Sequence, residues 1–227
     1  MNRAVALPHE VRDLARRLGA TDDASLLSVT LTQRDTMRHR PAGRAIRFRA
    51  AQTIDLRQTG FEWQATLGPF GCISVTDALK SGKADLSVRV FRRLRIGGVR
   101  GGPAAAKGEI MRYLAELAWA PDAILCNATL VWTVIDERTL RVSAGQGDGR
   151  GQVELRLDES GRIDSVAARD RPRKEGSRFV ERPWRGHFRN YRKYQGRWLP
   201  FSGEVGWVLD EGAFTAWHGE ILSWTCR

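Results

Sequence analysis

The chain has 227 residues, of which 42% are hydrophobic, and its 37 Lys and Arg against 26 Asp and Glu give a formal net charge of +11. Eight tryptophans argue for large buried aromatic surfaces and against disorder, and the length suits one large β domain or two small ones. The positive charge would attract phosphates, anionic lipid or acidic ligands, although an arginine-rich proteome produces the same excess without such a partner.

Targeting and metal-binding signals are missing from the sequence. The first twenty residues lack the apolar core of a signal peptide, and no run of about 18 apolar residues could span a bilayer. We therefore expect a cytoplasmic protein. The three cysteines are far apart, the four histidines lack metal-ligand spacing, and the glycine-rich segment 145–151 matches no phosphate-binding loop. We expect no metal and no cofactor.

The chain begins with a predicted short amphipathic helix over residues 7–19. Pro8 suits the first turn and Gly19 suits the stop, while Val11, Leu14 and Leu18 share one face. The apolar face is small, which favours a helix that caps a sheet over one that lies on a membrane.

From residue 26 to 97 the apolar residues alternate with a period of two, which predicts a first set of strands. Gly60, the Gly68–Pro69 pair and Ser81–Gly82 mark turns between them. Residues 97–103, GGVRGGP, are predicted to form a flexible loop that leads into the next helix.

The strongest single element is a predicted helix over residues 107–119, within KGEIMRYLAELAWAP. Apolar residues surround most of it, which is typical of a buried helix. Only Glu109, Arg112 and Glu116 interrupt them, at i, i+3 and i+7, so they form one ridge. Because buried charges must be paired or used, the ridge is an internal ion network, a wall of a pocket, or both.

A second set of strands is predicted over residues 128–224, with residues 146–151 as a turn. Its densest basic stretch, 169–194, mixes Arg and Lys with aromatic residues, a pattern that suits single-stranded nucleic acid. Acidic residues dilute the charge and no known nucleic-acid motif accompanies it, which favours two amphipathic strands instead.

Together these elements predict one domain over residues 1–227, mainly β with minor α. Ten to twelve antiparallel strands would form a single large curved sheet or open barrel, with the central helix in its concavity and the short helix at the N-terminus. A helix that is apolar on most sides needs such an enclosure, and a covered sheet protects its edges.

The chain resembles an uncharacterised bacterial family, a domain of unknown function, over most of its length. The resemblance rests on the opening Leu7–Pro8, the Phe-x-Trp-x-Ala strand at 61–65, the helix motif at 108–121 and the tryptophans of the late strands. It implies membership but no activity. The curved-sheet prediction is similar to periplasmic lipoprotein-carrier folds, an analogy of fold only.

Three of the candidate site residues have alternative interpretations. Glu109 and Glu116 could divide acid and base roles, or both could bind Arg112 in a structural bridge. Asp77 could complete a site with Arg112 or cap a turn. The candidate ligand-binding residues are Arg38, Trp63, Asp77, Glu109, Arg112, Tyr113, Glu116, Trp132 and Trp207.

The sequence supports three functional hypotheses. The first is a binding module for an apolar or amphipathic small ligand, whose acidic head group, if present, would meet Arg112. The second is a hydrolase or isomerase that uses Glu109 or Glu116. The third is a basic scaffold that binds nucleic acid or another partner, and it predicts a packed interior. The oligomeric state is left open.

Overall fold

The computed structural model describes residues 6–90 and 93–227. Thirteen strands occur in these residues: β1 (Ser28–Met37), β2 (Ile46–Asp55), β3 (Phe61–Leu67), β4 (Ile73–Lys80), β5 (Lys83–Val90), β6 (Leu94–Arg100), β7 (Val131–Asp136), β8 (Thr139–Ala144), β9 (Gly151–Leu157), β10 (Ile163–Glu175), β11 (Arg178–Tyr194), β12 (Arg197–Leu209) and β13 (Gly212–Cys226). The helices are α1 (His9–Leu18), α2 (Pro103–Ala115) and α3 (Ala123–Cys126), with short 3-10 segments η1 (Pro69–Gly71), η2 (Glu116–Ala118) and η3 (Gly147–Gly149).

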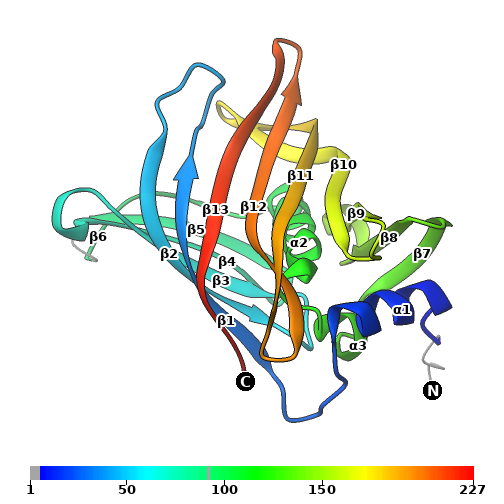
Figure 1. Cartoon of the computed structure of the whole chain (residues 1–227). Coiled ribbons are helices and arrows are strands. Elements are labelled where there is room, and N and C mark those ends of the chain that lie inside the picture. The colour runs from blue at the N-terminus through cyan, green and yellow to red at the C-terminus, as the bar shows by residue number, and fades with distance from the viewer. Residues whose placement is uncertain (1–5, 91–92) are drawn as a thin grey trace.

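All thirteen strands belong to one antiparallel sheet, in the order β6-β5-β4-β3-β2-β1-β13-β12-β11-β10-β9-β8-β7. Each half of the chain forms a run of neighbouring hairpins, and the pairing of β1 with β13 joins the two runs. The sheet curls into a half-barrel around α2, as Figure 1 shows. The predicted fold class, a curved antiparallel sheet with a helix in its concavity, is confirmed.

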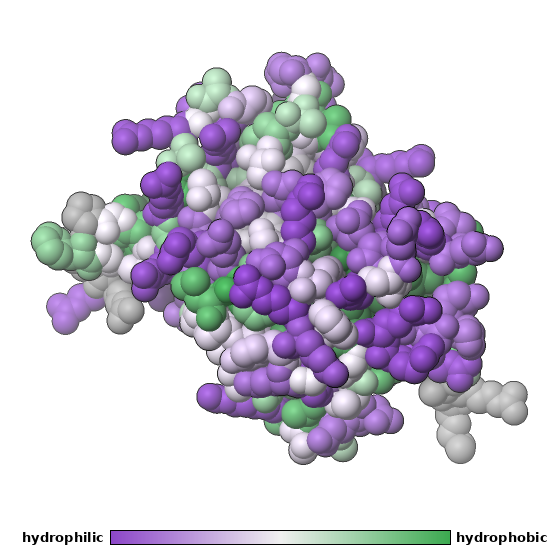
Figure 2. Space-filling model, in the orientation of Figure 1, coloured by the Kyte–Doolittle hydropathy of each residue, from purple (hydrophilic) through white to green (hydrophobic). Residues whose placement is uncertain are grey.

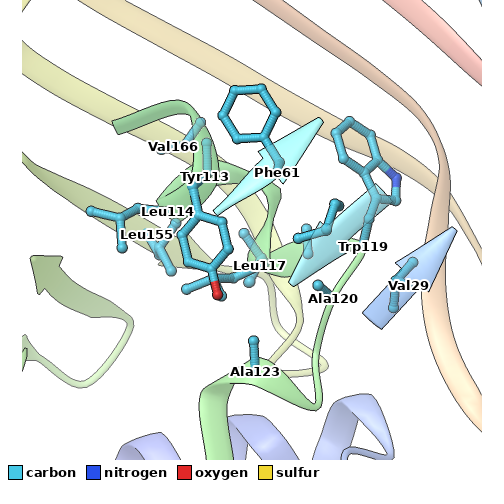
Figure 3. Packing of buried hydrophobic residues seen from close by; sticks show 14 of the residues in the cluster. Val29, Phe61, Tyr113, Leu114, Leu117, Trp119, Ala120, Ala123, Leu155 and Val166 are labelled. Carbon is cyan, nitrogen blue, oxygen red and sulfur yellow. The ribbon is translucent and has the colours of Figure 1, made fainter. Parts of the chain in front are cut away.

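The α2 helix is buried because most of its surface packs on the inner face of the sheet, chiefly on β8, β9 and β10. Figure 3 shows Tyr113, Leu114 and Leu117 pointing into the cluster that contains Leu155 and Val166. Contact with β9 is close: a Cβ at Gly151 would lie 2.9 Å from Ile110 Cγ2. Glycine at this position therefore lets the helix approach the strand.

The predicted bounds of the central helix need correction at its start. The helix begins at Pro103, four residues before the predicted 107, with Gly102 as its N-cap and three alanines in its first turns. Proline at the first helical position and alanine after it both favour helix, so the sequence already contained this signal.

The predicted loop at 97–103 is wrong over most of its length. Residues 97–100 belong to β6, which pairs with β5 at the edge of the sheet. Backbone pairing with β5 outweighs the weak strand preference of Gly97 and Gly98. Counting this strand brings the sheet to thirteen described strands, above the predicted ten to twelve.

The N-terminal helix lies within the predicted bounds. Val11, Leu14 and Leu18 are fully buried, and the helix packs on α3 and β12. Gly19 ends it with φ 74°, and a Cβ there would also lie 2.3 Å from the carbonyl oxygen of Gly196. Glycine is thus required twice at this position, for the backbone conformation and for the close approach.

The outer surface of the sheet is mostly hydrophilic in the view of Figure 2, with apolar residues scattered across it. No helix among the described residues is long and apolar enough to cross a membrane. The buried apolar side chains are instead concentrated inside the half-barrel, where the candidate site lies.

Candidate functional site: a cavity between the sheet and the central helix

A cavity of about 520 Å³ lies between the inner face of the sheet and one side of α2. Most of its wall is aliphatic or aromatic, contributed by strands from both halves of the chain. The apolar lining residues are Met37, Ile46, Phe48, Trp63, Leu67, Val75, Leu86, Val88, Ala115, Trp119, Trp184, Phe188, Val205 and Trp217. The polar lining residues are His39, Asp77, Glu109, Arg112, Glu116, Arg171 and Glu204. The volume is that of ordinary small-molecule pockets, about 300–1,000 Å³.

Strand register explains why polar and aromatic groups meet on this wall. Gln52 on β2 is opposite Trp63 on β3, which is opposite Asp77 on β4, which is opposite Leu86 on β5. Directly opposed residues of an antiparallel sheet point to the same face. This row therefore presents an amide, an indole and a carboxylate to α2.

Arg112 connects the helix to that row. Its Nη1 donates to Asp77 Oδ2 at 2.8 Å and its Nε to Glu116 Oε1 at 2.8 Å, while Gln52 donates to the other oxygen of Glu116. The guanidinium also lies 4.6 Å from the ring centroid of Phe61. Burial opposes the charge, but Glu116 and Asp77 outweigh it and raise the pKa of Arg112. Arg112 thus forms two ion pairs within the protein, through its Nε and its Nη1.

Glu109 lies on the same side of α2 but outside this bridge. Its Oε2 is buried and has no hydrogen-bond partner among the described residues. Burial, followed by repulsion from Asp77, raises the pKa of Glu109 to about 7. Its carboxyl group is therefore held close to the point of half-protonation at neutral pH.

Arg171 extends from β10 into the cavity, where its guanidinium lies 4.4 Å from the ring centroid of Trp184. Its Nε is buried without a hydrogen-bond partner in the described part of the chain. Burial lowers the pKa of Arg171, partly offset by the nearby Glu109. Arg171 is thus a cation on the cavity wall whose Nε–H has no partner among the described residues.

Asp35 lies deep in the sheet beside this cluster, 1% exposed, with no properly oriented hydrogen bond to either oxygen from the described residues. Burial raises its pKa to about 7, and the neighbouring Trp217 indole offsets only part of this effect. Gly219, directly opposite Asp35 on β13, leaves room for the side chains of Asp35 and Trp217. A Cβ at Gly219 would lie 2.6 Å from Asp35 Oδ1. We conclude that the sheet buries a second carboxyl with a raised pKa.

The cavity contains five of the nine residues that the sequence proposed for the site: Trp63, Asp77, Glu109, Arg112 and Glu116. Four others lie elsewhere. Arg38 is exposed just after β1, and Trp132 lies on β7. Trp207 on β12 is not among the lining residues, but its ring centroid lies 5.6 Å from the guanidinium of the cavity residue Arg171 and 5.8 Å from that of Arg173. Tyr113 is on the far side of α2, where its hydroxyl donates to the Asp55 carbonyl at 3.0 Å.

The geometry also shows whether Asp77 caps a turn or binds Arg112, and which carboxylates form the ion bridge with Arg112. Asp77 is a mid-strand residue of β4 that binds Arg112, so it caps no turn. The bridge is Asp77–Arg112–Glu116 and not the expected Glu109–Arg112–Glu116, because the cross-strand row brings Asp77 to the guanidinium. Spacing along one helix could not reveal a partner on a strand.

Sequence reasoning missed Asp35, Gln52 and Arg171. A signal existed for the first two. Val29, Leu31, Gln33 and Asp35 alternate on β1, and Phe48, Ala50, Gln52 and Ile54 alternate on β2; all eight are buried. A polar residue at a core-facing position of an alternating strand departs from the expected pattern, and such departures are typical of functional sites. Arg171 had no such signal, because the β10 register shifts between Ala168 and Arg171.

The described residues also do not meet the requirements of a metal site. Within residues 6–90 and 93–227, no three or more His, Cys, Asp or Glu side chains cluster in a way that could hold one. The site offers instead an apolar space with charged groups at one part of its wall.

A curled antiparallel half-barrel around a helix, with a cavity between them, is the architecture of the lipoprotein-carrier class of folds. The chain belongs to a family of unknown function, DUF6544, whose sequence profile matches residues 2–219. The membership that the sequence resemblance implied is thereby confirmed. A comparison with curated proteins finds no match.

Solved structures share the fold at low sequence identity. A "putative outer membrane lipoprotein-sorting protein domain" from Vibrio parahaemolyticus superposes with a TM-score of 0.53 at 10% identity, covering 96% of this chain and 91% of the other. A LolA superfamily protein from Nitrosomonas europaea gives 0.51 at 11% identity, covering 98% and 94%. A DUF1329 family protein from Desulfovibrio piger gives 0.52 at 11% identity, covering 96% and 91%.

Proposed function

We propose that this protein is a binding module for an apolar or amphipathic small ligand, which occupies the cavity between the sheet and α2. The main observation is the cavity itself: about 520 Å³, with a mostly aliphatic and aromatic wall. Burying apolar ligand surface there contributes roughly 25 cal/mol per Å². Structural likeness to lipoprotein-sorting and LolA superfamily proteins supports a hydrophobic ligand.

The other two hypotheses fit the geometry less well. A scaffold predicts a filled interior, and the cavity opposes that expectation. An enzyme that uses both glutamates is disfavoured because Glu116 is bound by Arg112 and Gln52. Glu109 alone, unpaired and with a pKa near 7, retains the property of an acid–base group.

The first experiment is native mass spectrometry of the protein purified from its source organism, followed by organic extraction. We expect a co-purifying amphiphile or apolar molecule whose mass accounts for the difference between native and denatured spectra. An empty protein that also fails to bind a panel of long-chain lipids and apolar fluorescent probes would contradict the proposal.

A cavity-filling variant gives the matched test. Val75→Trp adds an indole to the cavity wall on β4 and should abolish probe binding. Val131→Trp, on the 56% exposed Val131 of β7, is the control and should bind normally. Both variants are first compared by thermal unfolding, so that a loss of binding is read only from a folded protein.

A further inference from the structure

The polar part of the cavity wall contains an unusual set of unsatisfied groups. Arg171 Nε, Trp63 Nε1 and Glu109 Oε2 are all buried without a hydrogen-bond partner in the described residues. All three residues line the cavity. Buried polar atoms are nearly always paired, so three orphans around one apolar space indicate that another molecule supplies their partners.

Two of these atoms are permanent donors, since an arginine Nε and an indole nitrogen each carry a hydrogen and accept nothing. They require an acceptor on the ligand. Arg112, the other cation of the wall, is already bound by Asp77 and Glu116. A head group that accepts hydrogen bonds would therefore meet Arg171 and Trp63, and not Arg112 as the sequence suggested.

The charges of the wall limit the head group further. Arg112 is already paired with two carboxylates, Asp77 and Glu116, whereas Arg171 has no ion pair among the described residues. Glu109 faces Asp77, Arg112, Glu116 and Arg171, and Glu204, His39 and the nearby Asp35 complete the ionisable surroundings. One free cation beside several carboxyl groups suits a ligand with one negative charge and repels one with two.

We propose that the cavity binds a long-chain carboxylic acid as its anion, with the carboxylate on the Nε–H of Arg171, the indole N–H of Trp63 as a further donor, and the Glu109 carboxyl group beside it. The apolar tail occupies the aliphatic and aromatic part of the cavity. This inference rests on the proposed function and specifies its ligand class. It assigns head-group recognition to β3, β10 and α2 together.

Protonation of Glu109 is linked to binding in this arrangement. A neutral carboxyl can donate to the bound carboxylate, whereas an ionised one repels it. Since burial and Asp77 place the pKa of Glu109 at about 7, affinity for the anion should be constant from pH 5.5 to 6.5 and fall at higher pH, by up to about tenfold per unit.

The test compares dodecanoic acid with 1-dodecanol, by calorimetric titration below their micelle or solubility limits. At pH 6 we expect the acid to bind at least about tenfold more tightly than the alcohol, because the charged Arg171 forms an ion pair with a carboxylate but only a hydrogen bond with an uncharged hydroxyl. Arg171→Gln should weaken binding of the acid far more than binding of the alcohol, and so remove this preference. Arg173→Gln, two residues along β10 and paired with Glu175, is the control and should keep the preference.

A second anionic ligand and a Glu109 variant test the proposal further. Dodecyl phosphate at pH 8, where it carries nearly two charges, should bind more weakly than dodecanoic acid. Glu109→Gln should still bind the acid and should lose most of the decline in affinity above pH 7. The three variants, Arg171→Gln, Arg173→Gln and Glu109→Gln, are accepted only if their unfolding midpoints show a folded protein.

The outcomes separate the two proposals. Equal affinity for acid and alcohol in the unchanged protein, or an equal loss of both in Arg171→Gln, overturns the head-group assignment and leaves the apolar binding function standing. Tighter binding of the phosphate than of the acid would overturn the monoanion assignment. Failure of every probe to bind overturns the proposed function, and the head-group assignment with it.

Discussion

Two clusters in this molecule bury carboxylates against arginines, and they differ in how completely they are satisfied. Asp122, just before α3, is fully buried and accepts hydrogen bonds from the Thr21 backbone at 2.8 Å, the Thr21 hydroxyl at 3.0 Å and Arg197 at 2.7 Å. Around the cavity, Glu109, Arg171 and Asp35 all keep buried atoms without partners in the part of the chain that the structure describes.

The satisfied Asp122 cluster has a structural role, whereas the unsatisfied cluster at the cavity has the properties of a binding site. The Asp122 cluster fastens the segment after α1 and the segment after α2 to the start of β12, and every interaction in it is internal. The cavity cluster leaves polar groups unpaired at a cost in folding free energy, which is reasonable only if a ligand later satisfies them. The following predictions, from the largest expected effect to the smallest, test this contrast.

Arg112→Leu should cause the largest loss, about 3–5 kcal/mol of unfolding free energy, because it leaves Asp77 and Glu116 without their shared cation. Urea unfolding at pH 7 measures it. Arg141→Leu is the control: its pair with Glu154 is half exposed, and its removal should cost under about 1 kcal/mol. Unchanged stability in Arg112→Leu would mean that the bridge does not hold α2 on the sheet.

Asp122→Ala should cost about 3 kcal/mol, because it removes the acceptor for Thr21 and Arg197 in a buried setting. The same unfolding assay applies, and ligand binding in the cavity should remain intact. Asp13→Ala breaks the exposed pair with Arg16 and should leave stability nearly unchanged. A similar loss in both variants would remove the distinction between the buried and exposed pairs.

Tyr113→Phe should cost about 1–2 kcal/mol. The hydroxyl donates to the Asp55 carbonyl and accepts from Asn127 Nδ2 at 2.9 Å, so its loss leaves two buried groups unpaired. Because Tyr113 faces away from the cavity, probe binding should be unaffected. A binding defect in this folded variant would show that the two sides of α2 are coupled.

Glu109→Gln should stabilise the empty protein by at least about 1 kcal/mol at pH 8 and by nothing at pH 4. The sign follows from the raised pKa: an ordinary carboxyl ionises near 4.5, whereas in the fold Glu109 ionises near 7. Its ionisation therefore destabilises the folded state progressively as the pH rises from 4.5 to 7, and fully above 7. Unfolding midpoints at several pH values measure this; a stability gain at pH 4 would contradict the assignment.

Several features could be predicted from the sequence because they depend on local periodicity. Alternating apolar residues specified strands, and the nearly all-apolar helix required an enclosing sheet, so the curved half-barrel followed. The ridge of Glu109, Arg112 and Glu116 was visible from helical spacing alone, and all three residues line the cavity.

Only the tertiary structure decided how those charges are used. Arg112 binds Asp77 because strand register places β4 beneath the helix, and Glu109 is left unpaired for the same reason. Arg171 reaches the cavity through an irregularity in β10, and Asp35 is buried beside a glycine of β13 almost two hundred residues away. Local sequence fixes which faces are apolar, but register and curvature determine which polar groups meet, because these depend on contacts between distant segments.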